Sequence, residues 1–131
     1  MTNFIGRWHL LGRKPNIIAD SAHNSHGITV ALKQIKEIYF EQLHFVIGMV
    51  NDKDIEKILS MLPKDARYYF AKANIPRGLD AKELKEKANA VGLKGRAYSS
   101  VKNALKAAKR KAEKDDLIYV GGSTFVVAEV I

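Results

Sequence analysis

Three short polar segments, each following an apolar run, carry the side chains that could do chemistry. Residues 20–24 read DSAHN and combine a carboxylate with an imidazole, and residues 51–54 read NDKD and place an ammonium between two carboxylates. Residues 121–124 read GGST and offer two hydroxyls beside two glycines. Groups of these types can bind ribose hydroxyls, carboxylates and phosphates. We therefore expect a site for a nucleotide or an anionic substrate.

The first segment has both a functional and a structural interpretation. Asp20 could accept hydrogen bonds from a ribose while His23 reaches toward the reacting centre. Ser21 or Asn24 could instead cap the helix that follows, and a single histidine is more often structural than catalytic. The residues alone leave both interpretations open.

The other two segments are equally ambiguous when each is taken alone. Lys53 could hold an anionic substrate, but Asp52 and Asp54 need no function at a helix start, because the helix dipole favours negative charge there. Ser123 and Thr124 follow two glycines that suit a close backbone approach to a carboxylate or phosphate. The same composition also occurs in ordinary turns.

The chain lacks the sequence motifs of a complete nucleotide-processing enzyme or metalloenzyme. It contains no G-x-x-x-x-G-K-[ST] phosphate loop, no G-x-G-x-x-G fingerprint and no H-E-x-x-H metal motif. It has no cysteine, which excludes disulfides, thiolate metal sites and cysteine nucleophiles. We expect that this chain builds no metal site and no complete catalytic site for nucleotide chemistry.

Apolar runs and helical spacing alternate along the chain. Short apolar runs predict strands at residues 16–20, 44–50, 66–71, 97–99 and 117–120. Apolar residues three and four positions apart predict helices at residues 27–38, 55–63, 84–92 and 101–114. This alternation is typical of βαβ units, and it predicts an α/β fold with a mostly parallel sheet and helices on both faces. Residues 8–11 precede a turn and add an antiparallel edge strand as a further expectation.

The predicted topology indicates where ligands should bind. In open α/β sheets, ligands bind outside the carboxyl ends of the strands, where loops and helix amino termini meet. All three polar segments follow predicted strands. We therefore expect Asp20, His23, Lys53 and Ser123 to converge at one edge of the sheet.

Length and charge limit the broad class of protein. The 131 residues make one domain, and the net charge is +8, with many of the lysines in the predicted helix at 101–114. An ordinary solvated helix face explains that helix, although a basic face could also bind nucleic acid or a membrane. No apolar run approaches the roughly 20 residues that span a bilayer, and the first residues lack a secretory signal, so we expect a cytoplasmic protein.

Taken in order, the polar segments resemble those of a known family. Gly6-Arg7, the D-x-A-H-N form at 20–24, the GMVNDKD run at 48–54 and the GGS run at 121–123 together resemble the carboxyl-terminal third of folylpolyglutamate synthase/dihydrofolate synthase. The same domain type is similar to the third domain of the Mur ligases. Ser21 departs from the glycine or other small residue that relatives often carry, and this departure affects no expected role.

The resemblance implies a single Rossmann-like domain over residues 1–131, with 1–7 as the remnant of an interdomain linker. It implies the carboxyl-terminal domain of an ATP-dependent ligase that adds L-glutamate to a folate or dihydropteroate carboxylate through an acyl phosphate. ATP and Mg would be bound mainly by a central ATPase domain that these residues lack. The fragment alone is therefore expected to be inactive.

The resemblance also implies residue roles. It puts Arg7 on the ATP phosphates, Asp20 on the nucleotide, and His23 near the transferred phosphate or the incoming amino acid. It puts Lys53 and Ser123 on glutamate. Second choices, which capping explains as well, are Asn24, Asp52, Asp54 and Thr124.

Two other functions remain open at this point. One is a Mur-type peptidoglycan precursor ligase domain. The other is a stand-alone basic module that binds phosphates or nucleic acid through residues 101–114. The folate interpretation is favoured by the D-x-A-H-N and GMVNDKD forms, and it implies neither a nucleic-acid nor a membrane partner. The residues do not distinguish dihydrofolate synthase from folylpolyglutamate synthase or a bifunctional enzyme.

Overall fold

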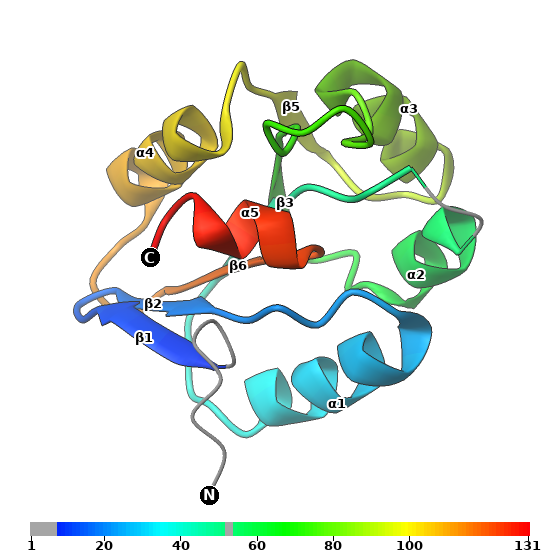
Figure 1. Cartoon of the computed structure of the whole chain (residues 1–131). Helices are drawn as coiled ribbons and strands as arrows, with labels where there is room; N and C mark the ends of the chain where they lie inside the picture. Colours follow the sequence, from blue (N-terminus) through cyan, green and yellow to red (C-terminus); the bar gives the residue numbers. More distant parts are fainter. Residues whose placement is uncertain (1–7, 52–53) are drawn as a thin grey trace, which may run out of the picture.

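The computed structural model describes residues 8–51 and 54–131, which build helices around one sheet (Figure 1). The strands are β1 (His9–Gly12), β2 (Asn16–Ala19), β3 (Leu43–Ile47), β4 (Arg67–Phe70), β5 (Gly95–Ala97) and β6 (Leu117–Gly121). The helices are α1 (Ser25–Lys36), α2 (Ile55–Met61), α3 (Ala81–Ala90), α4 (Val101–Lys111) and α5 (Thr124–Ala128). None of these helices is long and apolar enough to cross a membrane.

The sheet has the order β1-β2-β6-β3-β4-β5, and only the β1–β2 pair is antiparallel. The predicted mostly parallel sheet with an antiparallel edge strand is therefore confirmed. The last strand lies in the middle, where Tyr119 of β6 is opposite Ile18 of β2 on one side and Phe45 of β3 on the other. Because β2, β6 and β3 are parallel neighbours, the segments that follow them leave the sheet at adjacent points.

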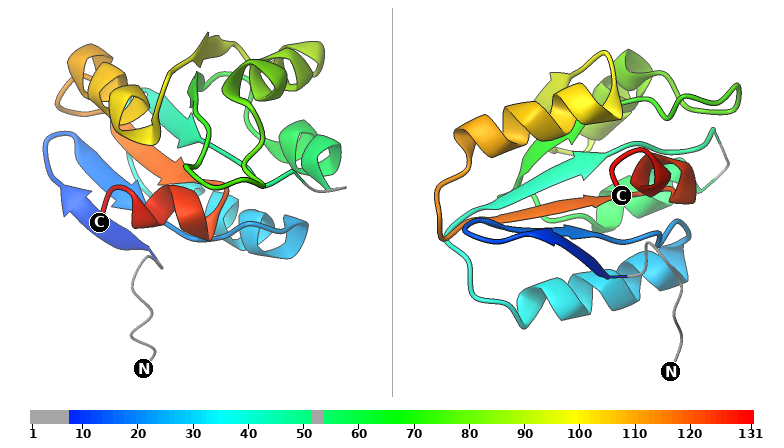
Figure 2. Two further views of the ribbon diagram at one scale, coloured as in Figure 1. Left: turned by 45° about the horizontal axis from the view of Figure 1, so that its top comes forward. Right: turned by 60° about the vertical axis from the view of Figure 1, so that its left-hand side comes forward.

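The two faces of the sheet bury different side chains, because successive strand residues point to opposite faces. In β4, Tyr68 and Phe70 pack in the core with residues of α1, α2 and α3, whereas Tyr69 between them packs with residues of α4 and α5. Helices therefore cover both faces, as predicted (Figure 2). Fully buried large side chains such as Phe45 and Phe70 each contribute roughly 1.5–3 kcal/mol to this packing.

Polar side chains begin four of these helices. Asn24, Asp80, Ser100 and Ser123 each accept hydrogen bonds from backbone N–H groups in the first turn of α1, α3, α4 and α5. These bonds satisfy donors that the first helical turn cannot pair internally. The capping role considered for Asn24 is thus observed.

Most boundaries differ from the predictions by one to three residues, as three elements illustrate. Strand β5 spans Gly95–Ala97 rather than 97–99, because Tyr98 N donates the last bond to Phe70 O before the chain turns into the α4 cap. Strand β3 ends at Ile47 rather than 50, since Gly48 N bonds Gly121 O and the next residues pair with the β4–α3 loop. The lysine-rich helix ends at Lys111 rather than 114.

Candidate functional site

The segments after β2, β3 and β6 meet at the carboxyl edge of the sheet and line a pocket of about 120 Å³. Four side chains singled out in the sequence line it, namely His23, Asp54, Ser123 and Thr124. The rest of the wall is mainly apolar and consists of Met49, Val50, Ile55, Ile58, Gly122 and Phe125. The fold thus brings together residues that lie up to about one hundred positions apart in the chain.

His23 is exposed on the loop between β2 and α1. Its Nδ1 lies 3.2 Å from the carbonyl oxygen of Ser21, and because a carbonyl only accepts, Nδ1 must donate this bond. A neutral ring then presents Nε2 as an acceptor. The next residue, Asn24, is committed to capping, since its Oδ1 accepts from Gly27 N at 2.8 Å. The loop therefore offers Nε2 of His23 to a ligand, whereas the side-chain amide of Asn24 caps α1.

Gly122 and Ser123 form the tight turn between β6 and α5. Gly122 has a φ of +100°, and a Cβ at this position would lie 2.4 Å from the carbonyl oxygen of Gly48. The neighbouring Ser123 is only 1% exposed, and its Oγ accepts from Phe125 N at 3.0 Å. Since Oγ accepts this bond, its hydroxyl proton remains able to donate to an anionic group in the pocket.

The segment after β3 is held by the loop after β4. Asn51 N donates to Arg77 O at 2.8 Å, and Leu79 N donates to Met49 O at 2.8 Å. Asp54 occupies the first cap position of α2, but its side chain makes no capping hydrogen bond to that helix. Its carboxylate lines the pocket. Asp52 and Lys53, like Arg7, lie outside the described residues.

Asp20 lies at the same edge but does not line the pocket. It is buried, and its two carboxylate oxygens accept from Trp8 N at 3.0 Å and from the Tyr119 hydroxyl at 3.1 Å. Through these bonds Asp20, which directly follows β2, connects Trp8 to Tyr119 of β6. Trp8 is the residue after Arg7 in the sequence. Asp20 thus anchors the start of the described chain at the carboxyl edge.

The pocket combines an imidazole, a carboxylate and two hydroxyls with an apolar floor. Such groups can orient a small polar substrate and exchange protons with it. Among residues 8–51 and 54–131, no cluster of three or more His, Asp or Glu side chains could hold a metal ion. The groups that line the pocket are suited to bind and position a substrate.

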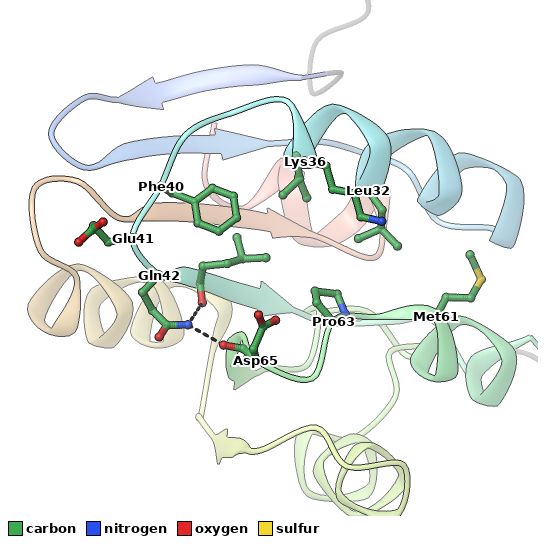
Figure 3. A pocket seen from close by; sticks show the side chains of 10 residues that line it. Leu32, Lys36, Phe40, Glu41, Gln42, Met61, Pro63 and Asp65 are labelled. Carbon is green, nitrogen blue, oxygen red and sulfur yellow. Dashed lines mark hydrogen bonds between the residues drawn. The ribbon is translucent and has the colours of Figure 1, made fainter.

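A larger hollow of about 480 Å³ lies at the opposite, amino edge of the sheet (Figure 3). Apolar side chains such as Leu32, Phe40 and Met61 form much of its lining. Gln42 spans one side, where its Nε2 donates to the carbonyl oxygens of Leu43 and Asp65. We place the candidate site at the smaller pocket, because that pocket lies at the carboxyl ends of the strands, where α/β sheets bind ligands.

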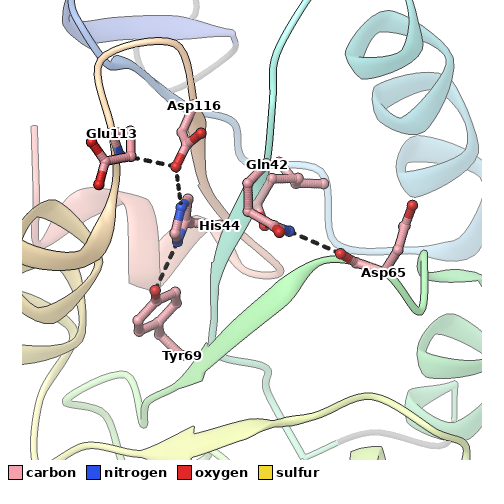
Figure 4. A network of polar contacts seen from close by, with 7 residues as sticks. Gln42, His44, Asp65, Tyr69, Glu113 and Asp116 are labelled. Carbon is pink, nitrogen blue, oxygen red and sulfur yellow. Dashed lines mark hydrogen bonds and ion pairs between the residues drawn. The ribbon is translucent and has the colours of Figure 1, made fainter.

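A buried polar network near this amino edge is not evident in the sequence (Figure 4). His44 is 1% exposed, with Nε2 at 2.8 Å from Asp116 Oδ2 and Nδ1 at 2.7 Å from the Tyr69 hydroxyl. Burial raises the pKa of Asp116, but hydrogen bonds from Glu113 N and His44 outweigh it and leave the pKa below its usual value. Burial also raises the pKa of Tyr69 to about 12. The network ties β3, β4 and β6 together.

Fold and pocket together define a Rossmann-like α/β domain, with its candidate site at the carboxyl edge of a mostly parallel sheet. Residues 6–124 match the protein family described as "Mur ligase, glutamate ligase domain". The chain belongs to this family.

Similar proteins narrow the comparison further. A probable bifunctional folylpolyglutamate synthase/dihydropteroate synthase of Haloferax volcanii is 33% identical over 127 residues, which are 95% of this chain and 15% of that protein. FolC of Escherichia coli, solved in complex with DHPP and ADP, has a TM-score of 0.88 and 32% identity over 97% of this chain and 30% of its own.

A solved bifunctional folylpolyglutamate synthase/dihydrofolate synthase with Mn, AMPPNP and L-glutamate bound also has a TM-score of 0.88. It shares 30% identity over 98% of this chain and 31% of its own. The chain therefore spans less than a third of each of these relatives.

Proposed function

We propose that this chain is the carboxyl-terminal domain of an ATP-dependent ligase that joins L-glutamate to the carboxylate of a folate or dihydropteroate compound. The observation that carries the proposal is the pocket that His23, Asp54, Ser123 and Thr124 line, in a domain of the glutamate ligase family. The names of its relatives support the substrate class, because they include a folylpolyglutamate synthase/dihydrofolate synthase and a probable folylpolyglutamate synthase/dihydropteroate synthase.

The proposed reaction has two steps. ATP transfers its γ-phosphoryl group to an oxygen of the substrate carboxylate, which gives an acyl phosphate and releases ADP. The amino nitrogen of glutamate then attacks the acyl carbon, expels inorganic phosphate, loses a proton and forms the amide. Both steps bring anionic groups together, so positioning and charge neutralisation supply most of the catalysis.

In this proposal the pocket receives the incoming amino acid. The Ser123 hydroxyl donates to a glutamate carboxylate, because its oxygen already accepts from Phe125 N. Nε2 of His23 faces the amine or the transferred phosphate and accepts a proton as the amide forms. Asp54 and Thr124 make additional contacts, to the ammonium and carboxylate groups of glutamate. Lys53, outside the described residues, neutralises the glutamate charge.

The nucleotide belongs mainly to another part of the parent enzyme. At about 120 Å³, the pocket is smaller than the roughly 300–1,000 Å³ of ordinary small-molecule sites. We therefore propose that a central ATPase domain binds most of ATP and its Mg. This chain contributes Arg7 to the phosphates and Asp20 to the nucleotide, with Asp20 also holding Trp8 in place.

A domain exchange tests the proposal. The matching part of E. coli FolC is replaced by this chain, and release of ADP is measured with L-glutamate and dihydropteroate or folate as substrates. We expect ADP release that requires both glutamate and the pterin compound. The 131-residue chain alone should release no ADP above background. A folded chimera that releases no ADP under any substrate combination would contradict the proposal, as would ADP production by the chain alone.

A further inference from the structure

A third concave surface lies over the β4–β5 edge of the sheet, on the face that α4 covers. We call this surface the basic hollow. It has a volume of about 300 Å³, and four of its lining side chains are positively charged, namely Arg67, Lys94, Arg96 and Lys111. Tyr69, Tyr98 and the adjoining backbone form the rest of its lining. No carboxylate is among its lining residues. It is separate from the carboxyl-edge pocket, with which it shares no lining residue.

The fold brings the four cations together from separate elements. Arg67 begins β4 and points to the same face as Tyr69, two residues later. Arg96 of β5 is directly opposite Tyr69 in the parallel register, so both arginines project from one face as diagonal neighbours. Lys94 precedes β5, and Lys111 is the last residue of α4, which packs across this face (Figure 2).

These charges are not neutralised by the surrounding protein. Among the described residues, none of the four cations forms an ion pair or a side-chain hydrogen bond. Asp116, whose field reaches Tyr69, is bound instead by His44 and Glu113 N. The four side chains are exposed, so the hollow presents a positively charged surface to solvent.

Protection of the sheet edge explains only part of the cluster. Exposed edge strands often carry lysine or arginine to prevent pairing with another chain, which would account for Lys94 and Arg96 on β5. Arg67 lies on the inner neighbour β4, and Lys111 lies on a helix, so neither protects the edge. The convergence of all four on one hollow with an aromatic wall therefore requires another cause.

We infer that the basic hollow is a binding site for a multiply charged anion, either a polyphosphate group or a short run of carboxylates. Two guanidinium groups present forked donors that match both phosphate and carboxylate oxygens. Four positive charges favour a ligand with several negative charges over a single ion, and the hollow has the volume of a small ligand. The inference does not depend on the proposed ligase activity, because it concerns a different surface.

The test is calorimetric titration of the 131-residue chain with two probes, inorganic tripolyphosphate and tetra-γ-glutamate. We expect at least one probe to bind at one site per chain with a Kd below about 1 mM. The probe that binds more tightly identifies the ligand as phosphate or carboxylate. The double variant Arg67→Gln/Arg96→Gln should weaken this binding by about tenfold or more, because it removes two charge-assisted donors.

A matched control removes the same charge elsewhere. Lys33→Gln/Lys82→Gln also lowers the net charge by two, from exposed positions on α1 and α3, and should change the Kd by less than about twofold. Equal weakening by both double variants would show non-specific attraction to a basic protein and overturn the inference. Absence of saturable binding by either probe would overturn it as well.

Discussion

Two histidines at opposite edges of the sheet show how differently one residue type is used. His23, at the carboxyl edge, is exposed, and within the described part of the chain its one hydrogen bond runs from Nδ1 to the Ser21 carbonyl. His44, near the amino edge, is buried, and both of its ring nitrogens are bonded, to Asp116 and Tyr69. The amino-edge network is saturated and holds strands together, whereas the carboxyl edge keeps a nitrogen and hydroxyls for a ligand.

This difference separates stability from chemistry within one small domain. In the buried network, both His44 nitrogens, the Tyr69 hydroxyl and Asp116 Oδ2 already have partners within the fold. The carboxyl-edge pocket contributes less to folding, since His23 and Thr124 are exposed and lie on short connecting segments. Substitutions at the two edges should therefore change different measured quantities.

The largest effect on folding should come from the buried network. Asp116→Ala removes the acceptor for both His44 Nε2 and Glu113 N and leaves buried donors unpaired. We expect a loss of about 3 kcal/mol in the free energy of unfolding, measured by urea denaturation. His23→Ala should change the same quantity by no more than about 0.5 kcal/mol. Similar losses in the two variants would remove the contrast between the edges.

The next largest effect should come from the turn that shapes the pocket. Gly122→Ala must place a Cβ 2.4 Å from Gly48 O at a φ of +100°, so we expect a loss of about 2 kcal/mol or more. Gly92→Ala is the matched control, because Gly92 has a φ of +91° but a Cβ there meets only the flexible Lys64 side chain, at 3.2 Å. Its loss should be about 1 kcal/mol. Equal losses would mean that the close backbone approach at Gly122 contributes nothing.

A smaller effect should appear as a dependence of stability on pH. The pKa of Asp116 is lower in the folded protein than its unfolded value of about 3.9, because bonds from Glu113 N and His44 outweigh burial. Its contribution is therefore complete above pH of about 4 and is lost as the pH falls through the folded pKa. We would measure urea unfolding from about pH 5 to about pH 3. The free energy of unfolding should fall more steeply in the parent chain than in Asp116→Asn. Parallel losses would assign the acid sensitivity to other groups.

Much of the fold could be predicted from the sequence, because apolar runs and helical spacing report burial directly. The parallel strands, the edge hairpin and the helices on both faces all follow from that pattern. Helix α5 could not be predicted, since five residues, Thr124–Ala128, are too short to show a helical period. Strand β5 was shifted because Gly95 and Arg96 have low strand propensity, and only pairing with β4 selects them.

The candidate site was predictable where its residues follow strands. His23, Asp54, Ser123 and Thr124 are polar residues in segments that come directly after apolar runs, and the topology rule brings such segments together. The sequence could not reveal that both Asp20 oxygens accept bonds from within the fold, because Tyr119 lies 99 positions away. It also could not reveal the His44 network, since His44 and Asp116 are 72 positions apart and each adjoins an apolar strand.

The central claim is that the carboxyl-edge pocket is this chain's part of a glutamate ligase site. The most direct measurement is kcat/KM for L-glutamate in the FolC chimera carrying His23→Ala, compared with His26→Ala, which removes an exposed histidine three positions later on α1. We predict a loss of about one hundredfold for His23→Ala, as expected when a general base is removed, and a change of less than about twofold for His26→Ala. Equal kcat/KM values for the two variants in an active chimera would contradict the claim.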